Sequence, residues 1–357
     1  MGMKFRAALG RTLLPAIAWG CACAALAAGD LPKRVVLVYS DARVEKKQPD
    51  KEDYARLAAF VDRQGKPVDT FFDGFLILGL KAKSGHGLVP GFGGPIQMED
   101  YDWFLGRLFE EGKQMAALQE AVQSLPPGLR KTRQVILAIP YPWQSSPRET
   151  RREMAGHFVS EASRRFEQGH FTCLALAGFY WLNETVPEKD LELVKETAQM
   201  VHARRLQFYW IPYFSAQGKD NWRADGFDCA MLQPNYAFRN VNTNRLEEAE
   251  ARRRSLGMTI EMEVARYTRN RPESPAWKDS FLKYVNAGVK YDWAALDCVG
   301  YYNGNDLVEM SRQPREYPYY ELIHKFVART LSQEDLQRLA ADAAAETTGR
   351  GAASPPR

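Results

Sequence analysis

Between residues 34 and 329 the chain alternates short apolar runs with longer amphipathic stretches. The apolar runs are rich in β-branched and aromatic residues, which is typical of strands, and the amphipathic stretches repeat apolar residues at helical spacing. Apolar strands joined by helices indicate a parallel sheet, and about eight such units are what a (β/α)8 barrel needs. The expected strands are residues 34–39, 72–78, 134–139, 171–182, 207–213, 228–233, 258–264 and 294–299.

We therefore predict an α/β protein whose single domain, residues 31–335, is a (β/α)8 TIM barrel. An open doubly wound sheet is the alternative, but no Gly-x-Gly-x-x-Gly sequence follows the first expected strand. Residues 101–122 are expected to form one long amphipathic helix. From residue 340 to residue 357 the sequence shifts to Ala, Thr, Gly, Ser and Pro, which predicts a disordered tail.

The N-terminus has the composition of a secretory signal peptide. Basic residues between Lys4 and Arg11 precede the apolar residues 13–19, and the sequence Ala-Leu-Ala ending at Ala27 matches a small-x-small cleavage site. We assign residues 1–28 to this signal and exclude them from the fold. The protein is expected to be secreted or periplasmic.

Two cysteines within this segment offer an alternative, a lipid-anchored protein. Cys21 or Cys23 would then carry the lipid. Trp19, which precedes Gly20 and Cys21, makes a poor lipoprotein cleavage motif, so simple secretion is favoured.

The composition of the remaining chain narrows the function classes. A hydrophobic content of 45% and a charged content of 26% are ordinary for a soluble globular protein. The net charge of +4 is small for this length, and Lys and Arg are mixed with Asp and Glu, so no nucleic-acid partner is expected. No stretch after the signal is long and apolar enough to span a membrane, and we expect a monomer.

The cysteines and histidines do not predict a metal site or a cofactor. Cys173, Cys229 and Cys298 each lie in or beside an expected strand, and we interpret them as buried thiols because an odd number does not form a disulfide framework. No pair of histidines has the spacing of zinc ligands.

The carboxyl ends of the expected strands are rich in aromatic and amide side chains. In a barrel these ends form the rim where active sites lie. Aromatic rings stack on the C–H faces of sugars and amides bind their hydroxyl groups, so this composition favours a carbohydrate ligand. The candidate binding residues are Asn183, Trp181, Tyr39, Trp143, Tyr213, Gln233, Asn235, Tyr236, Tyr267 and Tyr302.

Three carboxylates are the candidate catalytic groups. Glu184 follows the fourth expected strand, and Glu261 and Glu263 lie two apart on the seventh, so they share the face expected to point into the barrel. A carboxylate inside a barrel is costly unless it is paired or functional. The structural alternative is an ion pair with Arg266 or Lys290, and for Glu184 an ordinary loop position.

Strands four and seven lie across the barrel mouth from each other, so carboxylates on both predict hydrolysis of a glycosidic bond. A separation of about 5–5.5 Å gives a retaining mechanism and about 6.5–9.5 Å an inverting one. A much larger separation favours the second hypothesis, a carbohydrate-binding barrel without catalysis. A shallow rim poor in aromatic residues would favour the third, a structural protein of the cell envelope.

The pair Asn183-Glu184 after strand four, with a glutamate at the end of strand seven, resembles the large clan of retaining glycoside hydrolases built on this barrel. The resemblance implies that Glu184 is the acid/base, that Asn183 binds the sugar 2-hydroxyl group and that Glu263 is the nucleophile. Glu261 is our alternative to Glu263 in this hypothesis.

The chain as a whole resembles a bacterial family known as a domain of unknown function, often found in secreted and polysaccharide-associated proteins. This resemblance implies a glycosidase-like barrel and a carbohydrate setting but no assigned chemistry. The matching stretches are Phe72-Asp-Gly-Phe-Leu, Tyr101-Asp-Trp103 with Leu118, Ile139-Pro-Tyr141, Gly178-Phe-Tyr-Trp181, Trp210-Ile-Pro-Tyr213, Gln233-Pro-Asn235 and Glu261-Met-Glu263.

Overall fold

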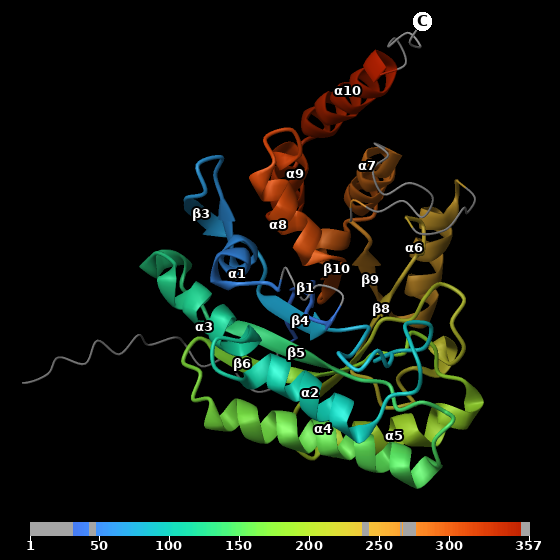
Figure 1. Ribbon diagram of the computed structural model, residues 1–357. Helices are drawn as coiled ribbons and strands as arrows, with labels where there is room; N and C mark the ends of the chain where they lie inside the picture. The colour runs from blue at the N-terminus through green and yellow to red at the C-terminus, as the bar shows by residue number, and fades with distance from the viewer. Residues whose placement is uncertain (1–30, 43–47, 238–242, 265, 267–275, 351–357) are drawn as a thin grey trace, which may run out of the picture.

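The computed structural model describes residues 31–42, 48–237, 243–264, 266 and 276–350, so the expected signal peptide lies outside the described residues. Parallel strands close into a single barrel, which confirms the predicted (β/α)8 architecture (Figure 1). In chain order the barrel strands are β1 (Arg34–Tyr39), β4 (Gly74–Leu78), β5 (Arg133–Ile139), β6 (Leu174–Trp181), β7 (Gln207–Trp210), β8 (Cys229–Leu232), β9 (Thr259–Met262) and β10 (Val299–Tyr301).

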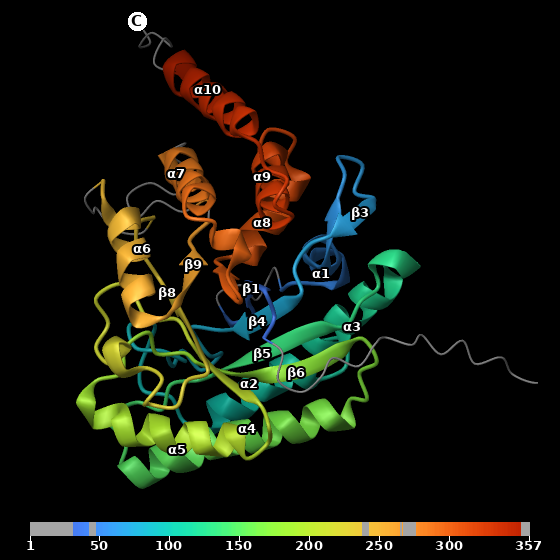
Figure 2. The same ribbon diagram turned by 180° about the vertical axis from the view of Figure 1, so that it is seen from behind.

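Helices surround the barrel (Figures 1 and 2), and their buried apolar side chains belong to the same core as those of the strands. Short 3-10 turns occur at 127–129, 188–190, 219–221 and 293–295. The helices are α1 (Lys51–Ala58), α2 (Met98–Phe109), α3 (Gln114–Ser124), α4 (Arg148–Gln168), α5 (Leu191–His202), α6 (Arg245–Leu256), α7 (Ala276–Lys290), α8 (Gly304–Arg312), α9 (Tyr317–Val327) and α10 (Gln333–Arg350).

Local sequence explains where several of these helices begin and end. The carboxylate of Asp50 accepts the backbone N–H groups of Glu52 and Asp53, while Asp53 accepts the N–H of Asp50, so α1 begins with a capping box. Gly257, with φ of 62°, ends α6 in the left-handed conformation that glycine adopts at low cost.

The barrel wall contains a close approach of two strands at Gly178. A Cβ atom at this position would lie 1.9 Å from the carbonyl oxygen of Gln207 on β7. The β5–β6 register shifts between Val135 and Ile136, and Ile136 pairs with Gly178. Glycine is therefore needed here because the neighbouring backbone occupies the space of a side chain.

Three expectations about the elements are corrected by the structure. The helix expected over residues 101–122 is two helices, α2 and α3, because Gly112 turns the chain with φ of 70°. The eighth strand begins at Val299 instead of residue 294. Trp293, fully buried with its indole N–H bonded to Glu250, begins a 3-10 turn over residues 293–295.

The third correction concerns the C-terminal tail, and the structure also contains one additional sheet. A two-stranded antiparallel sheet, β2 (Ala59–Val61) and β3 (Pro67–Thr70), follows α1 and was not expected. The tail expected from residue 340 is helical up to Arg350, because α10 continues through an Ala-rich sequence of high helix propensity. This helix projects away from the barrel (Figures 1 and 2).

The interior of the protein is closely packed. Cys173, Cys229 and Cys298 are buried free thiols, as predicted. None of the helices in the described part of the chain combines the length and hydrophobicity needed to cross a bilayer.

Candidate functional site

A cavity of about 350 Å³ opens at the carboxyl end of the barrel. Its volume lies at the lower end of the ~300–1,000 Å³ typical of ligand pockets. Most of the predicted site residues line it, since successive strands end at the same rim. These are Tyr39, Asn183, Glu184, Tyr213, Gln233, Asn235, Glu261 and Tyr302.

Glu184 is held by contacts between its own loop and the loop that follows β7. The indole N–H of Trp210 donates to the carbonyl of Asn183 at 2.9 Å, and the N–H of Tyr213 donates to the carbonyl of Glu184 at 3.4 Å. Asn183 is buried and Glu184 is half-buried. The loop therefore presents both side chains to the cavity from a fixed backbone.

Glu261 enters the same cavity from β9 and is almost completely buried. Burial raises its pKa well above the usual range, and the nearby charges of Glu263 and Glu184 raise it further. The Oε2 atom of Glu261 has no hydrogen-bond partner among the described residues. A buried carboxyl oxygen of this kind is available to a ligand in the cavity.

Two amide side chains connect the β8 loop to Glu261. The amide N–H of Asn235 donates to Oε1 of Gln233 at 2.6 Å. The oxygen of the Gln233 amide therefore faces Asn235, and its amino group faces away from Asn235. A hydrogen bond from Gln233 lowers the pKa of Glu261 and so opposes the effect of burial. Asn235 is itself fixed, because its Oδ1 accepts the N–H of Phe214 at 3.0 Å. Both amides thus orient a carboxylate as well as lining the cavity.

Glu263 occupies a different position from the one its spacing predicted. β9 ends at Met262, and the chain turns so that the N–H of Val264 donates to the carbonyl of Met262 at 2.9 Å. The Glu263 carboxylate faces the β8 loop and α7, where it accepts the N–H groups of Tyr236 and Ala237 and the hydroxyl of Tyr284. It is not among the cavity-lining residues.

Burial raises the pKa of Glu263 to about 8, although the backbone donors of Ala237 and Tyr236 act in the opposite direction. The structural alternative for the β9 glutamates was an ion pair with Arg266. Among the described residues, Arg266 does not pair with either glutamate. Arg266 instead pairs with Asp306 and Glu316.

Tyrosines form the remaining polar part of the wall. Tyr39 and Tyr302 pack edge to face with ring centroids 5.9 Å apart. Burial raises the pKa of Tyr39 and Tyr302, and the charges of Glu261 and Glu184 add to the shift. Asn305 on α8 fixes the backbone of Tyr39, accepting its N–H at 2.9 Å and donating to its carbonyl at 3.3 Å. These hydroxyl groups therefore lie close to both carboxylates.

Three of the predicted binding residues that the structure describes do not line the cavity. Trp181 is fully buried on the opposite face of β6, where it packs against Tyr141 and Phe208. Trp143 bonds to the loop after β4, and Tyr236 packs against Tyr284 on α7. Tyr267 lies outside the described residues.

The candidate binding residues leave out Tyr180, which was expected only as apolar wall beside Glu184, and a loop of the cavity wall. Tyr180 lines the cavity because residues alternate along β6, so the neighbour of Trp181 points inward. The loop between β4 and α2 contributes Leu80, Val89, Pro90 and Phe92. Strand alternation was the signal for Tyr180, whereas nothing in the sequence indicated how this glycine-rich loop folds over the barrel.

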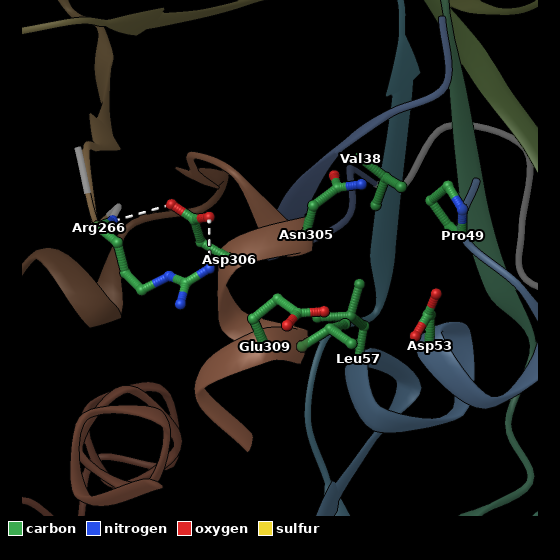
Figure 3. Close-up of a pocket in the computed structure, with 9 residues that line it drawn as sticks. Val38, Pro49, Asp53, Leu57, Arg266, Asn305, Asp306 and Glu309 are labelled. Carbon is green, nitrogen blue, oxygen red and sulfur yellow. Dashed lines mark hydrogen bonds and ion pairs between the residues drawn. The ribbon is translucent and has the colours of Figure 1, made fainter. Parts of the chain in front are cut away.

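A second, smaller cavity of about 160 Å³ lies on the other side of β1 (Figure 3). Leu37 and Tyr39 line the first cavity, so Val38 points outward, toward α1 and α8. Asp306 in this second cavity is bonded to Arg266, as the dashed lines show. The larger cavity is the candidate site because it lies inside the barrel rim and holds the two carboxylates from different strands.

No group of three or more His, Cys, Asp or Glu in the described ranges is arranged to hold a metal ion. The arrangement of acidic, amide and phenolic groups is instead suited to acid–base or nucleophilic chemistry by carboxylates.

Several solved structures are similar to this chain at low sequence identity. A protein of Bacteroides thetaiotaomicron classed as an alpha-L-fucosidase is 12% identical, with a TM-score of 0.47 over 86% of this chain and 100% of its own. The intracellular xylanase TsXylA from Thermoanaerobacterium saccharolyticum is 10% identical, with a TM-score of 0.41 over 77% and 86%. A mutant tryptophan synthase alpha-subunit from Pyrococcus furiosus is 10% identical, with a TM-score of 0.40 over 84% and 97%.

No curated protein shows significant sequence similarity to the chain. One family model matches residues 34–327, which include every barrel strand and all the described residues of the cavity wall. The chain therefore belongs to the family described as a domain of unknown function, DUF4855.

Proposed function

We propose that this protein is a glycoside hydrolase in which Glu184 and Glu261 are the two catalytic carboxyl groups. The observation that supports the proposal most strongly is that both side chains line one cavity at the barrel rim, one after β6 and one on β9. These are the fourth and seventh strands of the barrel, the positions that the resemblance to the retaining clan assigns to the two carboxylates.

The position of Glu263 is the reason for choosing Glu261 as the second group. Its Oε2 atom accepts three donors from the β8 loop and α7, and its side chain is not part of the cavity wall. Each glutamate has one oxygen without a partner among the described residues, but only that of Glu261 belongs to a side chain that lines the cavity. A nucleophile must reach the substrate, and Glu261 meets this condition.

The rest of the wall supports a saccharide as the substrate. Tyr39, Tyr180, Tyr213 and Tyr302 provide hydroxyl groups and ring faces, and Asn183, Gln233 and Asn235 provide amides. This mixture binds the alternating hydroxyl and C–H faces of sugars.

In the proposed reaction the ionised Glu261 carboxylate attacks the anomeric carbon as the bond to the leaving oxygen breaks. Glu184 donates its proton to that oxygen. Water then attacks the glycosyl–enzyme ester, Glu184 accepts the proton of the water, and the Glu261 carboxylate is released. Burial and the charges of Glu263 and Glu184 raise the pKa of Glu261, so its proton must first pass to Glu184, which then donates it to the leaving oxygen.

The experiment that tests the proposal is release of reducing sugar from arabinoxylan, mixed-linkage β-glucan, galactomannan and chitosan by the wild type and by Glu184→Gln. We expect the wild type to cleave at least one polymer and the variant to lose at least about 100-fold in rate, as is usual when general acid–base catalysis is removed. Binding of the polymers without any cleavage by the wild type would contradict hydrolysis and support the non-catalytic binding barrel.

A further inference from the structure

The loop between β4 and α2, residues 79–97, is firmly attached to the barrel at its base. The N–H of Tyr141 donates to the carbonyl of Leu88 at 2.7 Å, and the indole N–H of Trp143 donates to the carbonyl of Gly87 at 3.0 Å. Leu88 and Ile96 are completely buried. The loop is therefore a built part of the cavity wall, held by one backbone and one side-chain donor from the loop that follows β5.

The tip of this loop presents an aromatic ring at the cavity mouth. Phe92 lines the cavity and is 39% exposed; Val68 on β3 is the only other large hydrophobic residue of the described chain that is as open to solvent. Glycines flank the ring. Gly91 has φ of 93°, and a Cβ at Gly93 would lie 2.1 Å from the carbonyl of Gly85, so the turn that exposes Phe92 requires glycine there.

Keeping an aromatic ring at a solvent-exposed position loses hydrophobic stabilisation, since the protein gains more from burying it. Here the ring is placed by a fixed loop at the edge of a cavity that already holds carboxylates, amides and phenols. A partly exposed aromatic side chain beside such groups is suited to stacking on the C–H face of a sugar.

We propose that Phe92 is a binding platform for a second sugar ring, the neighbour of the ring held between Glu184 and Glu261. This inference rests on the proposed function and extends it: the ligand is a chain of sugars that leaves the cavity over the β4–α2 loop, and its affinity depends on ring stacking outside the reaction centre. The position makes Phe92 a specificity-determining residue and not a catalytic one.

The test measures binding separately from cleavage. In the Glu184→Gln background, Phe92→Ala, Phe92→Trp and the control Val68→Ala are run in native gels containing arabinoxylan, mixed-linkage β-glucan, galactomannan or chitosan. We expect Phe92→Ala to weaken retardation by about 3- to 10-fold in the apparent Kd, the size of one aromatic stacking contact. Phe92→Trp should bind at least as tightly as the parent, and Val68→Ala should equal it.

Each other outcome overturns the inference. If the parent is retarded and Phe92→Ala equals it, the platform is wrong while the proposed function stands. If Val68→Ala weakens binding as much as Phe92→Ala, the effect is not specific to the loop. If none of the polymers retards the parent, both the platform and the proposed saccharide ligand are contradicted.

Discussion

Glu184 and Glu261 line the same cavity although two strands, β7 and β8, separate their positions in the barrel wall. The charge of Glu184 adds to the effects of burial and of Glu263, which together raise the pKa of Glu261. Gln233 opposes this shift through its hydrogen bond. Besides burial, three neighbouring side chains therefore shift the pKa of Glu261, and each of them can be substituted separately.

The first prediction concerns the pH dependence of activity. A raised pKa of Glu261 delays its ionisation, so kcat/KM should rise with pH until Glu261 has lost its proton. Gln233→Leu removes the hydrogen bond that lowers this pKa, and the rising limb should move to higher pH. Glu263→Gln removes the like charge that Glu263 gains near pH 8, and the limb should move to lower pH. Profiles of kcat/KM between pH 4 and 9 check both shifts. If the rising limb moved in the same direction in both variants, the opposite effects of Gln233 and Glu263 on the pKa of Glu261 would be contradicted.

The second prediction concerns stability. Burial raises the pKa of Glu263 to about 8, above its ordinary value of 4.5. Between these two pH values the folded protein holds a proton that the unfolded chain has lost, so the free energy of unfolding should fall as pH rises from about 4.5 to about 8. Glu263→Gln should reduce this slope and be more stable than the wild type at pH 8.

Urea unfolding at pH 5 and pH 8 measures the effect. The matched control is Glu149→Gln, whose side chain is exposed on α4. A slope for Glu263→Gln equal to that of the wild type would show that Glu263 does not hold a proton in the folded state.

The sequence was sufficient for the barrel because its strands are continuous apolar runs, and it located Glu184 and Glu261 at the rim. It favoured Glu263 over Glu261 as the second catalytic carboxylate, whereas Glu261 is the one that lines the cavity. Period-two spacing places both on one face, but the strand ends at Met262 and the turn redirects Glu263 toward Tyr284. Phe92 was missed because a glycine-rich loop has no periodicity from which its position can be read.

A third prediction tests a buried ion pair between α4 and the segment that follows β6. Arg151 on α4 bonds to Asp190 at 2.7 Å, both are buried, and Tyr141 donates to the same carboxylate at 2.6 Å. Arg151→Met leaves that buried charge without its cation and should cost about 3–5 kcal/mol in the free energy of unfolding. Arg148→Met removes an exposed pair with Glu196 and should cost less than about 1 kcal/mol. Equal losses in chemical denaturation would contradict the distinction.

A fourth prediction tests the contact at Gly178. Gly178→Ala would put a methyl group 1.9 Å from the Gln207 carbonyl, so β6 and β7 must separate. We expect a loss of several kcal/mol, in the exceptional range above about 4 kcal/mol for a single substitution. Gly128→Ala has no atom within 4 Å of its new methyl group and should stay within about 0.5 kcal/mol of the wild type. Similar midpoints for the two variants would show that the strands are not in close contact.

The most direct measurement of the central claim compares Glu261→Gln with Glu263→Gln in reducing-sugar release from a polymer that the wild type cleaves, with folding checked by circular dichroism. The two substitutions are the same chemical change two residues apart. We predict that Glu261→Gln loses at least about 100-fold in kcat while Glu263→Gln keeps most of the activity. Activity that is retained in Glu261→Gln and lost in Glu263→Gln would contradict the assignment of Glu261 as the second catalytic group.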